Sequence, residues 1–151
     1  NYCTYTNFPS SFMDINSAKG AMGARGVDVI SDNDVIIAGT TYGNDISTEK
    51  NNAALKTTGV VPTAEVGFIL RLNPASAGAN DYLFGSKIRT KSSGAYTFAS
   101  DVRHSNGSFY LLGYSDGVVA NIPTGAFQET NAGAVDIFLY KVKSLFNALK
   151  T

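Results

Sequence analysis

Two stretches of similar sequence decide how this chain is interpreted. The stretch GVDVISDNDVIIAG at residues 26–39 resembles ASDVRHSNGSFYLLG at residues 99–113. The pair Asp28-Val29 recurs 73 residues later as Asp101-Val102, and Gly39 recurs 74 residues later as Gly113, so one inserted residue explains the difference. Repetition at a fixed spacing is typical of proteins that are built from repeated structural units. The sequence therefore predicts two diverged copies of one unit.

Further correspondences extend each copy in the same order. Residues 66–72 (VGFILRL) match residues 136–142 (DIFLYKV) at an offset of 70, and both keep a basic residue between apolar ones. Residues 82–88 follow the first copy as residues 144–149 follow the second, and residues 11–15 are expected to form the same strand before the first copy. We therefore expect a leading strand segment at 1–25, a first unit at 26–98 and a second unit at 99–151.

Each unit is interpreted as four short strands that are separated by turns. Asn106-Gly107 stands between two strand-like runs, and this dipeptide is a strong short-range hairpin signal. The chain contains nine Phe and eight Tyr together with many Gly, Thr, Ser and Asn residues, a composition suited to strands and tight turns. The prediction is an all-β fold of antiparallel four-stranded units, with long loops at 40–62 and 114–134.

Charge and hydropathy exclude several classes of protein. Twelve basic residues balance twelve acidic ones, so no net charge draws the chain to nucleic acid or to an anionic membrane. The apolar runs are far too short to cross a bilayer, and no signal-peptide pattern opens the chain, which fits a soluble or already processed protein. Cys3 is the only cysteine, so it is expected to be a buried thiol or to pair with a cysteine in a missing segment.

With the units aligned, the second one resembles the SBBP family of bacterial β-propeller repeats. The resemblance rests on three motifs: SNGSFYLLG at 105–113, IPTGAFQ at 122–128 and DIFLYKV at 136–142. It implies units of a β-propeller, in a secreted or cell-surface bacterial protein that serves structure or adhesion and is not an enzyme. Because a propeller closes with four to eight blades, we expect a partial propeller, or a ring completed by other chains or by missing segments.

Few residues offer catalytic or metal chemistry. His104 is the only histidine and stands just before the predicted turn, so we expect a surface turn residue, not a catalytic base. The acidic run at 31–34 could offer oxygen ligands to calcium, but it lacks the pattern of a calcium loop and is expected to form a turn. Asp28 and Asp101 are expected to hold equivalent places and share a structural hydrogen bond, and Asp136 to bond a turn amide. We expect no cofactor and no metal.

Three functional hypotheses follow. The first is a non-catalytic structural or adhesion module that contacts other protein chains or copies of itself. The second is a carbohydrate-binding module that uses the loops at 40–62 and 114–134 on surface glycans, and the third is a fragment of a larger extracellular enzyme. Fold alone does not decide among them. The residues expected to contact a ligand or partner are Tyr42, Tyr114 and Phe127.

Overall fold

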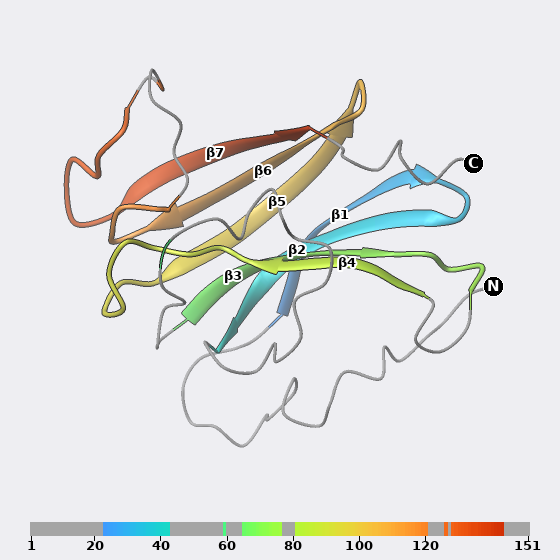
Figure 1. Cartoon of the computed structure of the whole chain (residues 1–151), viewed down its shortest axis with the longest axis horizontal. Coiled ribbons are helices and arrows are strands. Elements are labelled where there is room, and N and C mark those ends of the chain that lie inside the picture. Colours follow the sequence, from blue (N-terminus) through green and yellow to red (C-terminus); the bar gives the residue numbers. More distant parts are fainter. Residues whose placement is uncertain are drawn as a thin grey trace.

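The structure is a computed structural model that describes residues 23–42, 59, 65–76, 81–120, 126 and 128–143. This part of the chain contains seven strands and no helix (Figure 1). The strands are β1 (Gly23–Ser31), β2 (Asp34–Tyr42), β3 (Glu65–Leu72), β4 (Tyr82–Lys87), β5 (Thr97–Ser105), β6 (Ser108–Ser115) and β7 (Asp136–Lys143).

The strands form two open antiparallel sheets. One sheet has the order β1-β2-β3-β4, and the other has the order β5-β6-β7. The predicted all-β class is confirmed, and so are antiparallel pairing throughout both sheets and four strands in the first of them. The strands expected at 11–15 and 144–149 lie outside the described residues. The expected boundary between residues 98 and 99 falls two residues into β5.

The hairpin between β5 and β6 turns at Asn106 and Gly107, as predicted. Both residues have positive φ values, 49° and 68°, and Ser105 pairs with Ser108 across them. Positive φ at both central residues is the geometry of a type I′ turn, whose twist matches that of the flanking strands. The hairpin between β1 and β2 also has two residues between its last pair, Ser31 and Asp34.

The sequence repeat is visible in the strand register. Gly39 of β2 lies opposite Phe68 of β3, and Gly113 of β6 lies opposite Phe138 of β7. A β-carbon at either glycine would overlap the phenylalanine ring that faces it. The two predicted correspondences, Gly39 with Gly113 and residues 66–72 with residues 136–142, are therefore confirmed.

The predicted equivalence of Asp28 and Asp101 is wrong by two positions. Asp28 pairs with Ile36, three residues before Gly39, whereas Asp101 pairs with Leu112, one residue before the equivalent Gly113. One of the two positions comes from a second bulge in β1, at residue 30, which β5 lacks; a bulge adds one residue to one strand of a pair. The other arises because the sequence alignment placed the one inserted residue in the second copy, whereas the strand register places it in the first. The bulges at residues 25 and 100 are common to both units.

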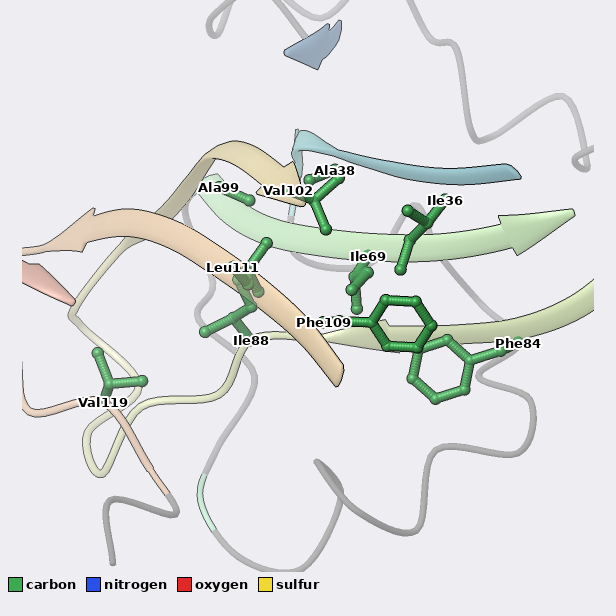
Figure 2. Close-up of a cluster of buried hydrophobic side chains, with 10 residues drawn as sticks. All are labelled: Ile36, Ala38, Ile69, Phe84, Ile88, Ala99, Val102, Phe109, Leu111 and Val119. Carbon is green, nitrogen blue, oxygen red and sulfur yellow. The ribbon is translucent and has the colours of Figure 1, made fainter. Parts of the chain in front are cut away.

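The hydrophobic core fills the space between the two sheets. Strand β5 contacts β1, β2 and β3, so the second sheet lies across the first (Figure 1). Figure 2 shows the ten buried side chains of this core, which are Ile36, Ala38, Ile69, Phe84, Ile88, Ala99, Val102, Phe109, Leu111 and Val119. Each fully buried large side chain contributes about 1.5–3 kcal/mol, so this shared core binds the two sheets into one unit.

Hydrogen bonds also connect the sheets at two places. The backbone amide of Gly67 in β3 donates to the hydroxyl of Thr97 in β5 at 2.9 Å, and that hydroxyl donates to the carbonyl of Ile88 at 3.0 Å. At the edge formed by β1 and β5, the backbone amide of His104 donates to the carboxylate of Asp28 at 2.6 Å. These bonds satisfy polar groups that the packing would otherwise leave without partners.

Candidate interaction surface

The outer face of the second sheet exposes large apolar side chains. Leu112 of β6 pairs with Leu139 of β7, and Tyr114 of β6 pairs with Ile137 of β7. Ile137 is 79% exposed, Leu139 is 66% exposed, and the other two are exposed as well. We call these four residues the outer patch. Apolar side chains that gather on one face often mark a site of protein contact.

The outer patch exists because β7 is apolar on both faces. Phe138, Tyr140 and Val142 pack against the core between the sheets, while Ile137 and Leu139 alternate with them and point the other way. A strand that is apolar on both faces is typical of one that is covered on both sides. This signal was present in the sequence, but the predicted contact residues included only Tyr114 from the patch.

Aromatic rings border the outer patch. The ring of Tyr114 stacks on Phe98 of β5, with centroids 4.6 Å apart and planes 13° apart, and Tyr96 meets Phe98 edge to face at 5.3 Å. Further along β6, the ammonium group of Lys141 lies 5.5 Å from the ring centre of Tyr110. The patch is thus apolar in its middle, aromatic along β5 and cationic toward the end of β7.

The other two residues predicted to contact a partner, Tyr42 and Phe127, have no described side chain. Tyr42 ends β2 and pairs with Glu65, but its side chain lies outside what the structure describes, and so does Phe127. Both expected loops were predicted to begin too early, because residues 40–42 are the end of β2 and residues 114–115 are the end of β6. Most of the remainder of the loop expected at 40–62 lies outside the described residues. The described residues therefore place one of the three predicted contact residues on a candidate surface.

The acidic run at 31–34 stabilises the first sheet. The carboxylate of Asp34 accepts two hydrogen bonds from the guanidinium group of Arg71, one of them from Nε at 2.6 Å. A bidentate pair of this kind is among the stronger polar contacts in proteins. Asp32 and Asn33 form the turn, as predicted.

Among the residues that the structure describes, no three His, Cys, Asp or Glu side chains gather where they could hold a metal ion.

His104 lies within β5 and not in the turn, which corrects the prediction. Its side chain is half-buried, and its ring lies 5.4 Å from that of Phe109. Its backbone amide donates to Asp28, and this bond is the main reason why the pKa of Asp28 lies below its usual value. His104 therefore takes part in the packing between the sheets.

Each of the three singled-out aspartates accepts local hydrogen bonds, as predicted. Asp28 and Asp101 each accept one from the backbone amide of the following residue at 2.9 Å, although they occupy different positions in the repeat. Asp136 accepts one from the amide of Ala132, which confirms its predicted role, and another from the side chain of Gln128 at 3.0 Å. Asp101 also lies 3.1 Å from the guanidinium group of Arg103 on the exposed edge.

Comparison with known proteins does not add to this picture. No protein-family model matches the chain, and no curated protein matches it. The resemblance to SBBP repeats therefore stays a prediction. Within the described ranges, no helix is long and apolar enough to cross a membrane.

Proposed function

We propose that this chain is a non-catalytic repeat module that acts through protein–protein contacts, in a structural or adhesive role. The observation that carries the proposal is the outer patch of Leu112, Tyr114, Ile137 and Leu139. Exposed apolar side chains on neighbouring strands are unfavourable in water, and covering them with another protein surface removes that cost.

The use of the acidic side chains supports a non-catalytic role. General acid–base catalysis needs carboxylates or histidines that face a substrate with suitably placed protons. Asp34 is paired with Arg71, Asp28 receives two backbone amides, and Asp136 holds the turn before β7. Each of these carboxylates has a structural partner, so each contributes to the fold.

We propose further that the units are blades of a β-propeller in a secreted or cell-surface bacterial protein. This part of the proposal rests on the resemblance of residues 105–113, 122–128 and 136–142 to SBBP repeats. The stacking of two antiparallel sheets through a shared core is compatible with neighbouring blades.

A carbohydrate-binding role is the second candidate. The observation that favours it is the partly exposed ring of Tyr114, which stacks on Phe98 at the border of the outer patch. Aromatic faces of this kind can stack on the apolar face of a sugar ring. Glycan-array binding that is lost in Tyr114→Ala would support this role, because the substitution removes the exposed ring and leaves the core in place.

Light scattering of the purified chain over a range of concentrations tests the first proposal. The monomer has a mass of 15.9 kDa. In the isolated chain the outer patches of two copies can cover each other. We therefore expect the measured mass to rise with concentration for the wild-type chain and to remain at the monomer value for Leu139→Lys, which places a charge in the middle of the patch. A wild-type chain that stays monomeric, with glycan binding that depends on Tyr114, would favour the carbohydrate-binding role instead.

A further inference from the structure

The two units of this chain stack in the same orientation, so that unlike faces meet. The first unit presents the side of β2 and β3 that carries Ala38 and Ile69, which we call its back face. The second unit presents the side of β6 and β7 that carries Leu111 and Phe138, which we call its front face. The interface inside the chain is therefore a contact of back face on front face.

The strand register shows which residues form the back face of the second unit. Since Gly39 corresponds to Gly113 and Phe68 to Phe138, Ala38 corresponds to Leu112 and Ile69 corresponds to Leu139. The paired strands agree, because Ala38 lies opposite Ile69 and Leu112 lies opposite Leu139. The outer patch is therefore the back face of the second unit.

Equivalent positions differ sharply in burial. Ala38 and Ile69 are 0% and 1% exposed under the second unit, while Leu112 and Leu139 are 42% and 66% exposed. The second unit thus keeps an apolar back face, although nothing among the described residues covers it. An apolar back face is what a unit needs when another unit stacks upon it.

The charged residue on the back face follows the same pattern. Arg71 of the first unit holds its guanidinium carbon 6.0 Å from the ring centre of Phe109, which belongs to the front face of the second unit. Lys141 occupies the position that corresponds to Arg71, opposite Tyr110 as Arg71 is opposite Ile36. A cation is therefore present where it could meet an aromatic ring of a partner.

The two back faces differ at one pair of equivalent positions, Gly67 and Ile137, and this difference describes the partner more closely. Gly67 has no side chain and lets the backbone of β5 approach β3, because a β-carbon there would lie 2.8 Å from the amide nitrogen of Ala99. The corresponding residue of the second unit is Ile137, whose side chain is 79% exposed. A partner strand at this place packs on a side chain instead of on backbone.

We propose that the outer patch docks the front face of a third repeat unit of the same kind, so that the head-to-tail stacking of this chain continues. The partner's chemistry is that of the front face of the second unit: an apolar sheet with a glycine opposite a phenylalanine. A second copy of the chain offers no open front face, because Phe68, Leu70 and Leu72 on the front of its first unit are already buried. The proposal rests on the proposed function, since it names the partner of the same surface.

A chain with an added unit tests this inference. Residues 88–151, which contain the connection after β4 and the second unit, are duplicated after Thr151. Leu139 of the middle unit is replaced by cysteine in a Cys3→Ser background, and its rate of maleimide labelling is compared with that of Leu139→Cys in the original chain. We expect labelling to slow by about tenfold or more, because the side chain becomes reachable only when the new interface opens.

Controls separate docking from other causes of protection. A cysteine at Leu139 of the last unit should keep the fast rate, and so should Asn33→Cys in the exposed turn. In case the cysteine chain folds poorly, Ile137→Lys in the middle unit gives an independent measurement. It should lower the melting temperature of the extended chain and leave that of the original chain unchanged, because Ile137 is exposed there.

Two outcomes would overturn the inference. An equal labelling rate in the original and extended chains, at concentrations where the original chain is monomeric, means that a third unit does not cover the patch. Protection that grows with concentration in the original chain, and that the added unit does not increase, identifies a second copy as the partner. Either result leaves the proposed protein-contact role to be judged separately, by the effect of Leu139→Lys on the solution mass.

Discussion

Two buried threonines allow a sharp test of how the sheets are held together. Thr97 and Thr40 are both almost completely buried, at 0% and 1% exposure. The hydroxyl of Thr97 accepts from the amide of Gly67 and donates to the carbonyl of Ile88. The hydroxyl of Thr40 has no hydrogen-bond partner among the described residues. Replacement by valine preserves the shape of each side chain and removes only the hydroxyl.

The magnitudes follow from the partners that each substitution leaves behind. Thr97→Val leaves a buried amide and a buried carbonyl without partners, and each such group costs about 1–3 kcal/mol, so we expect the free energy of unfolding to fall by about 2–6 kcal/mol. Thr40→Val leaves no donor or acceptor without its partner, because it only replaces an unpaired buried hydroxyl with a methyl group. We therefore expect an unchanged stability or a gain of about 1 kcal/mol.

Equilibrium unfolding in urea measures both values, and each threonine serves as the control for the other. The slope of the transition should remain equal in the two variants, because neither changes the surface that unfolding exposes. Equal losses of stability in Thr97→Val and Thr40→Val would refute the argument, since β-propensity and packing would then outweigh the hydrogen bonds across the sheets.

Three further predictions follow from local contacts. Gly107→Ala should lower stability by about 1 kcal/mol because of its positive φ, while Gly94→Ala, which has open space and no positive φ, should change it little, as thermal unfolding can show. Asp34→Asn should cost about 2 kcal/mol in urea unfolding, because it weakens the bidentate contact with Arg71. The folded-state pKa of Asp28 lies below its ordinary value of 3.8, mainly because the carboxylate accepts the backbone amide of His104. The stabilising effect of this carboxylate is therefore present above pH 3.8 and is lost as the pH falls through the folded-state pKa. Unfolding curves of wild type and Asp28→Asn should therefore converge in acid, and a constant difference across pH would contradict this.

The sequence predicted the features that depend on local chemistry. The Asn106-Gly107 hairpin follows from backbone conformations that few other residues adopt. The equivalence of Gly39 and Gly113 follows from the close approach of a phenylalanine ring, which only a glycine permits. These constraints act within one hairpin or one strand pair, so they leave a pattern in the sequence.

Features that depend on stacking could not be predicted in this way. The bulge at residue 30 adds one residue to β1 that β5 lacks, and no residue type marks it in the sequence, so Asp28 was aligned with Asp101 although the two lie two positions apart in the register. The sequence of β7 has apolar residues at both odd and even positions, so it indicates a strand with two apolar faces. Which of the two faces is covered depends on how the sheets stack. Tyr114 was selected as a loop-borne ring, whereas the exposure of Leu139 and Ile137 beside it emerges only from the packed sheets.

Thiol labelling at two equivalent positions tests the central claim most directly. In a Cys3→Ser background, Ile69→Cys and Leu139→Cys place one cysteine each on the back face of the first unit and of the second unit. The stacked arrangement predicts that the cysteine at position 69 reacts more slowly, on the order of a hundredfold, because it lies under the second sheet. Equal rates at the two positions in the folded chain would contradict the stacking of the units and the identity of the open face.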